Sequence, residues 1–146
     1  MAKWLLLFAS FTGFSGVALG AFAAHGLRNK LADNLLNAFQ TGVHYQLWHT
    51  MALIGVALLL LRFPESGLFK ATGVLFALGI LLFSGSLYLL ALTGISKLGM
   101  VTPMGGLTWL IAWGCFAAGI WRSLCSVYTS DHADAPPRAA RGGRRR

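Results

Sequence analysis

The chain has 146 residues, of which 56% are hydrophobic and 11% are charged, and its formal net charge is +8. This composition excludes an ordinary soluble domain, because soluble helices need charged outer faces. The charge does not indicate nucleic-acid binding either, since five of the 12 basic residues are arginines in the final stretch 138–146 and no aromatic element accompanies them.

Four long apolar runs fill most of the sequence. A helix rises about 1.5 Å per residue, so about 20 apolar residues cross a hydrocarbon core about 30 Å thick. We therefore expect an all-α fold, an integral membrane bundle of four transmembrane helices that forms one domain over residues 1–125. The predicted helices cover residues 4–24, 43–61, 70–92 and 103–121.

The first run also has the pattern of a secretory signal peptide. Lys3 precedes the apolar stretch, and small residues at 18–20 or 21–23 match a cleavage site. The run is long for a signal peptide, and Gly16 and Gly20 have the spacing of helix-packing residues. We therefore favour a retained transmembrane helix that ends near Gly26.

A one-sided pattern follows the first helix. Leu31, Leu35, Phe39 and Val43 are spaced four apart among Asn, Asp, Lys and Gln. Such a pattern predicts a short amphipathic helix between the first and second transmembrane helices, or an extension of the second helix beyond the membrane.

The later helices have clear ends. Pro64 stops the second helix, and Gly94 follows the third. Thr102 is the expected N-cap of the fourth helix, with Pro103 at its first position. The Pro, Ala, Gly and Arg content of residues 126–146 predicts a disordered basic tail.

Four crossings place both termini and the 62–70 turn on one side. That side has nine basic residues and the other has three, Arg28, Lys30 and Lys97. The positive-inside rule therefore predicts that both termini are cytoplasmic. Trp4 and Trp121 are expected near the inner interface, and Trp48 and Trp109 near the outer one.

Polar side chains of the helices gather at the end opposite the termini. We interpret them as a candidate polar cluster that binds lipid or a partner: His25, His44, Gln46, His49, Ser84, Ser86 and Thr102.

The histidines are also candidate metal or haem ligands. His44 and His49 lie about 140° apart around a helix, so they do not chelate one ion. A pair formed by His25 and His49 stays open as an alternative. Neutral imidazoles that hydrogen-bond to carbonyls and to polar side chains are the favoured interpretation, so we expect no metal and no cofactor.

No carboxylate lies in an apolar run. Asp33, Glu65, Asp131 and Asp134 all fall in loops or in the tail. Ion-coupled transporters usually carry a carboxylate within the membrane, so this class is disfavoured. No catalytic residue is predicted, and the protein is not expected to be an enzyme.

Glycines recur along the helices, where small residues allow close backbone approach in lipid. The candidate packing positions are Gly16, Gly20, Gly85, Gly105 and Gly106.

Several of these segments form ordered motifs: residues 20–27 (GAFAAHGL), 39–49 with Thr41-Gly42 and Tyr45-Gln46, 82–88 (LFSGSLY) and 102–106 (TPMGG). In this order they resemble the YgdD-like family of small four-helix bacterial inner-membrane proteins of unknown function. The resemblance covers about residues 4–122. It implies the fold and a multi-pass location in the bacterial inner (plasma) membrane, and it carries no activity or catalytic residue.

The leading hypothesis is a non-enzymatic accessory or structural membrane protein whose polar, non-cytoplasmic end binds lipid, a second copy or a larger membrane complex, and not nucleic acid. One alternative is a small oligomeric transporter or channel with a path lined by Ser84, Ser86 and His49. Another is a metal- or haem-binding protein that uses His25, His44 or His49.

Overall fold

The computed structural model describes the backbone of residues 1–133 and the side chains of residues 1–125. Over residues 1–133 every regular element is a helix. Four stretches are long and apolar enough to cross a membrane: Ala2–Leu27, Asp33–Arg62, Gly67–Thr93 and Ser96–Cys125. The predicted all-α bundle of four transmembrane helices is confirmed.

Two of the four spans contain a short π-helical turn, in which the helix holds one residue more per turn than an α-helix. The elements in chain order are α1 (Ala2–Phe22), the π-helical η1 (Ala23–Leu27), α2 (Asp33–Arg62), α3 (Gly67–Gly79), the π-helical η2 (Ile80–Ser84), α4 (Gly85–Thr93), the 3₁₀-helical η3 (Ser96–Met100) and α5 (Thr102–Ala133).

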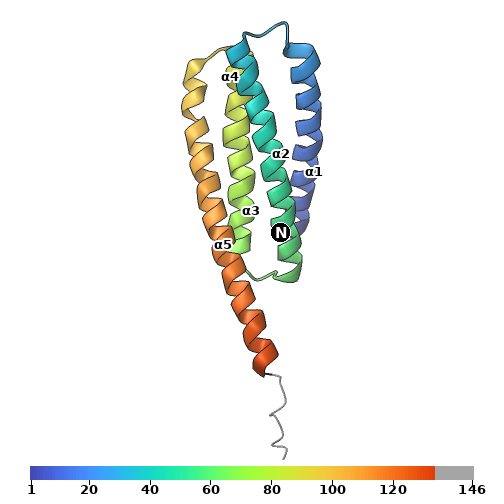
Figure 1. Ribbon diagram of the computed structural model, residues 1–146, viewed down its shortest axis with the longest axis vertical. Helices are drawn as coiled ribbons and strands as arrows, with labels where there is room; N and C mark the ends of the chain where they lie inside the picture. Colours follow the sequence, from blue (N-terminus) through green and yellow to red (C-terminus); the bar gives the residue numbers. More distant parts are fainter. Residues whose placement is uncertain (134–146) are drawn as a thin grey trace, which may run out of the picture.

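The helices run alternately up and down, and their order across the bundle follows their order in the chain (Figure 1). α1 packs on α2, α2 packs on α3 and α4, and α3 packs on α5, so α1 and α5 lie at opposite edges. The N-terminus lies at the same end as the α2–α3 turn, and α5 extends beyond this end (Figure 1).

The predicted amphipathic helix is not a separate element. α2 runs without a break from Asp33 to Arg62, because neither Gly nor Pro breaks its first turns and the apolar stripe keeps its helical spacing. Leu36, Phe39 and Val43 form a small core with the end of α1 and with α4. The alternative prediction, an extension of the second helix, is the correct one.

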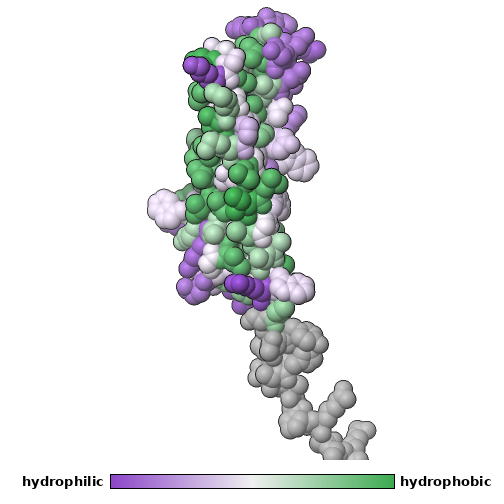
Figure 2. Space-filling model, turned by 90° about the vertical axis from the view of Figure 1, so that its left-hand side faces the viewer, coloured by the Kyte–Doolittle hydropathy of each residue, from purple (hydrophilic) through white to green (hydrophobic). Residues whose placement is uncertain are grey.

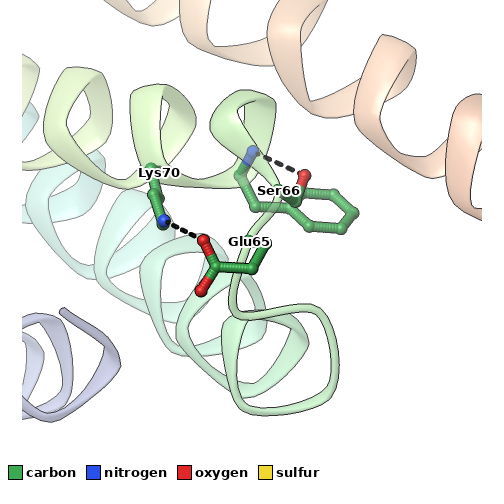
Figure 3. A network of polar contacts seen from close by, with 4 residues as sticks. Glu65, Ser66 and Lys70 are labelled. Carbon is green, nitrogen blue, oxygen red and sulfur yellow. Dashed lines mark hydrogen bonds and ion pairs between the residues drawn. The ribbon is translucent and has the colours of Figure 1, made fainter.

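The turn between α2 and α3 is closed by polar side chains (Figure 3). The Ser66 hydroxyl accepts a hydrogen bond from the Phe69 amide at 3.4 Å, which caps α3. Lys70 Nζ lies 3.3 Å from Glu65 Oε2 on the exposed side of the turn.

The third span ends at the opposite side of the bundle, where Gly94 follows α4. Its backbone is left-handed, with φ 71°, a conformation that favours glycine.

α5 differs from its prediction at both ends. The Val101 carbonyl accepts the first amide hydrogen bonds, from Met104 and Gly105, so Thr102 is not the N-cap. The helix continues to Ala133 and therefore includes residues 126–133 of the predicted tail, while residues 134–146 lie outside the described part.

The surface of the bundle is apolar around its middle. Figure 2 shows a hydrophobic band between two hydrophilic ends on the face in view. On α1, Trp4, Phe11 and Phe14 are all exposed, a pattern that would be costly in water and suits contact with lipid tails.

Candidate functional site

Close contacts between antiparallel neighbours fix the relative heights of the helices. The Cβ position of Gly20 faces Val43, that of Gly42 faces Tyr88, and that of Gly105 faces Phe83. At these heights the seven predicted polar residues do not form one cluster. They divide into a buried network, a groove, a hydroxyl pair and two residues that stand apart.

Gln46 is the centre of a buried network that joins three helices. Its Nε2 donates to the Thr12 carbonyl of α1 at 2.6 Å and to Ser15 Oγ at 3.0 Å. Its Oε1 accepts from the Tyr88 hydroxyl of α4 at 2.9 Å. Thr50 extends the network by donating to Thr12 Oγ1 at 2.9 Å.

This network is structural. Both hydrogens of the Gln46 amide and its oxygen have partners, and the side chain is 4% exposed. In lipid, polar contacts between helices replace the hydrophobic driving force that water supplies. The Gln46 network therefore stabilises the association of α1, α2 and α4 and offers no open position to a ligand.

His49 forms a second polar site with Trp109 of α5. The two rings stack with centroids 3.6 Å apart and planes 1° from parallel. His49 Nδ1 lies 2.9 Å from the Tyr45 carbonyl oxygen, and Trp109 Nε1 donates to the Phe76 carbonyl at 3.3 Å.

Trp109 is 3% exposed, so its predicted position in an outer aromatic belt is wrong. Its indole fits inside the bundle because Gly79 of α3 leaves no side chain where the ring lies. The ring therefore packs against His49 instead of facing the membrane interface.

A groove of about 960 Å³ lies between α2 and α5 beside this stacked pair. The backbones of α2 and α5 are bridged by aromatic side chains, among them Tyr45, His49 and Trp109. Trp48, 76% exposed, and Leu110, 70% exposed, lie on its lining, so the groove opens to the surface. The remaining lining residues are His44, Ala52, Phe83, Gly106 and Trp113.

The other predicted polar residues lie elsewhere. The Ser86 hydroxyl donates to the Phe83 carbonyl at 2.9 Å and lies 2.8 Å from Thr102 Oγ1, so Thr102 is the donor of that pair and links α5 to α4. Ser84 is fully buried, and its Oγ has no hydrogen-bond partner among residues 1–125. His25 is exposed in η1, at the end of the first span.

These positions bear on both alternative functions. Gly13 lies opposite Thr50, so His25 is about 16 Å further along the axis than His49, and the two do not hold one ion. Nor do the side chains of the described chain bring together three or more His, Cys, Asp or Glu residues that could hold a metal. Of the three residues expected to line a transport path, only His49 lines the groove.

Four residues that were not predicted from the sequence complete the Gln46 network: Thr12, Ser15, Thr50 and Tyr88. Thr12 and Ser15, with Ser10 before them, interrupt an otherwise apolar run, and the spacing of three between Thr12 and Ser15 places these two on one helix face. Their positions could therefore have been predicted from the sequence. The contact of Tyr88 with Gln46 could not, because it depends on the rotation of α4 relative to α2.

The predicted packing glycines have different environments. Gly16 faces Leu47 and Gln46, Gly20 faces Val43, and Gly105 faces the Phe83 backbone. A Cβ on Gly106 would lie at an ordinary 3.9 Å from the Phe83 ring. Gly85 has no heavy atom of the described residues within 4 Å of its Cβ position, so it does not pack against another helix of this chain, and a packing role between subunits stays a prediction.

Comparison with known sequences gives consistent results. The sequence pattern of a family described as "Protein of unknown function (DUF423)" matches residues 19–106. The chain is 41% identical to the UPF0382 inner membrane protein YgdD of Escherichia coli (strain K12), over 83% of the chain and 92% of the relative. It is 41% identical to the UPF0382 membrane protein YwdK of Bacillus subtilis (strain 168), over 76% of the chain and 90% of the relative.

A UPF0382 membrane protein of Haemophilus influenzae is 45% identical, over 83% of the chain and 95% of the relative. No solved structure matches the chain. The matched stretch includes Gln46, His49 and Tyr88, whereas Thr12 and Trp109 lie outside the family pattern.

Proposed function

The chain belongs to the DUF423 family, as its YgdD-like motifs indicated, and from this premise we propose that it is a non-enzymatic accessory membrane protein that binds lipid-soluble molecules in the groove between α2 and α5. The family description gives no function, so the proposal rests on the groove itself.

The size and lining of the groove support the proposal. Small-molecule sites are typically concave, about 300–1,000 Å³ in volume, and mostly apolar with a few polar groups. This groove has a volume of about 960 Å³ and combines Trp48, Phe83, Trp109 and Trp113 with the imidazole of His49. It opens on the apolar surface, which gives lipid-soluble molecules direct access.

The chemistry of the lining supports a binding role. Its ionisable side chains are His44, Tyr45 and His49, and its lining includes neither a carboxylate nor a thiol. Asp33 begins α2 and Glu65 lies in the turn before α3, so both carboxylates lie near the ends of the bundle and away from the groove.

The positions of the basic residues support an orientation in the bacterial inner membrane with both termini in the cytoplasm. Two surface depressions at the end near the N-terminus are lined by basic residues. One includes Lys3 and Lys70, together with Glu65, and the other, beside the α2–α3 turn, includes Arg62 and Arg122. Under the positive-inside rule this end faces the cytoplasm. His49 is near the middle of α2, so the groove lies at about half the height of the bundle.

A pair of substitutions on α5 tests the binding role. Gly106→Leu places a branched side chain in the groove, whereas Gly114→Leu adds the same side chain at an exposed position with nothing within 4 Å. Native mass spectrometry of protein extracted from membranes measures the bound molecules. We expect the native protein and Gly114→Leu to retain a bound lipid-soluble molecule that Gly106→Leu loses, and equal occupancy in all three would contradict the proposal.

A further inference from the structure

His49 offers a hydrogen-bond acceptor that no side chain or backbone group of residues 1–125 uses. Its Nδ1 lies 2.9 Å from the Tyr45 carbonyl oxygen. A carbonyl oxygen only accepts, so Nδ1 carries the hydrogen, and in a neutral imidazole Nε2 then has a free lone pair. The neutral form applies because a charged ring within a membrane is costly.

The acyl chains of the surrounding lipid cannot donate a hydrogen bond to this acceptor. His49 lines the groove, and Nε2 is on the side of its ring away from the Tyr45 carbonyl. A polar atom without a partner in an apolar environment is unfavourable, and an acyl chain has no donor. An acyl chain also gains little from the apolar walls, because lipid tails are as apolar as the side chains they would contact. The preferred occupant therefore brings a donor.

The walls of the groove add a preference for a flat ring. Tyr45, His49 and Trp109 are nearly parallel, with interplanar angles of 12° for Tyr45 with either partner and 1° for His49 with Trp109. Phe83 lies tilted against Trp109 at 4.7 Å between centroids. Aromatic faces arranged in this way favour offset stacking or edge contacts with another ring.

We propose that the groove binds a lipid-soluble phenol, the headgroup chemistry that alkylphenols and quinols share, whose hydroxyl donates to His49 Nε2 while its ring packs against Tyr45 and Phe83. The apolar tail then leaves the groove past Trp48 and Leu110, which are exposed at its opening. This inference rests on the proposed function, because it names the chemistry of the groove's ligand.

Two probes with the same ring and octyl chain, one with a hydroxyl donor and one without, test the hydrogen bond. 4-Octylphenol carries a hydroxyl, and 4-octylanisole replaces its hydrogen with a methyl group. Each is titrated into the full-length protein in lipid nanodiscs, and binding is measured by the change in tryptophan fluorescence. We expect the phenol to bind about fivefold or more tightly than the anisole, the size of one hydrogen bond in an apolar environment.

The matched variant is His49→Phe, which retains a ring for Trp109 to stack on and removes both nitrogens. It should bind the two probes equally, whereas His25→Phe, at an exposed histidine outside the groove, should keep the native preference. A preference for the phenol that persists in a folded His49→Phe protein would overturn the assignment of the acceptor.

A measurement on the native protein does not depend on the folding of a variant. The ¹⁵N resonance of His49 Nε2 should move on addition of 4-octylphenol and stay in place with 4-octylanisole. If both probes bind equally and Gly106→Leu abolishes both, the phenol inference fails and the proposed binding role stands. If neither probe binds and no molecule is retained from membranes, both fail.

Discussion

A methyl group on Gly105 would lie 2.5 Å from the backbone nitrogen of Phe83 and 2.8 Å from its Cα. The first turn of α5 therefore contacts the backbone of η2 directly, with no side chain between them. Backbone atoms cannot move aside as a flexible side chain can, so this contact requires glycine at position 105. Close approach here holds Phe83 and Trp109 at one wall of the groove.

Gly105→Ala should destabilise the bundle by about 1–3 kcal/mol, the usual cost of overpacking a close contact. Gly106→Ala is the matched control, because its Cβ would lie at 3.9 Å from the Phe83 ring, and its effect should stay within about 0.5 kcal/mol. Titration of each protein from mild detergent into denaturing detergent measures the free energy of unfolding. Equal stability of the two variants would contradict the close approach to Phe83 as the reason for glycine at 105.

Gln46→Leu removes the centre of the buried network and leaves the Tyr88 hydroxyl without its acceptor. We expect a loss of about 1–2 kcal/mol of stability, because three hydrogen bonds are lost and such bonds between membrane helices contribute about 0.6 kcal/mol each on average. A double-mutant cycle with Tyr88→Phe isolates the shared term, and the two losses should not add. Ser10→Ala, which removes only an exposed bond within α1, serves as the control and should change stability little.

The orientation of the chain is tested by cysteine labelling in intact cells. In a background with Cys115 and Cys125 replaced by serine, Asn29→Cys lies in the loop after η1 and Glu65→Cys in the turn before α3. A membrane-impermeant thiol reagent should label Asn29→Cys directly and Glu65→Cys only after the membrane is opened. The reverse pattern would show that the termini face outward, and labelling of both from outside would contradict the four-span topology.

The first helix should remain in the mature protein, because Thr12 and Ser15 supply both acceptors of the Gln46 amide. Removal of residues 1–23 would leave this amide without partners inside the bundle. The intact mass of protein purified from membranes measures the outcome. A mass that corresponds to a chain beginning near residue 21 or 24 would establish cleavage as a signal peptide.

Hydropathy was sufficient to predict the four spans, because membrane thickness sets helix length directly. Four spans in turn determine which helix ends share a side of the bundle. It was not sufficient to place Trp109 or Gly85. When a helix is apolar on all sides, composition does not distinguish the face that meets lipid from the face that meets another helix. Trp109 is buried because Gly79 lies at the same height on the neighbouring helix and leaves room for its ring. The sequence of one helix does not show which residue of another helix lies opposite.

The candidate site was predicted only in part for the same reason. His44 and His49 were identified as polar groups within an apolar helix, and both line the groove. Ser86 and Thr102 were expected beside them, but Ser86 donates to the Phe83 carbonyl and Thr102 donates to Ser86. A hydroxyl hydrogen that is already donated is not available to an acceptor on a ligand, and only the distances show which hydroxyl hydrogens are donated.

The π-helical turn η2 accommodates one extra residue within the third span. The residues after it are therefore set back by about 100° around the axis from the positions that an unbroken α-helix would give them. That offset lets α3 lie against α5 while Tyr88 of α4 reaches Gln46 of α2. Deleting a single amino acid between 80 and 84 would let this turn become regular α-helix while α3 and α4 keep the faces that meet α5 and α2, so the span should tolerate the loss of one residue at this turn.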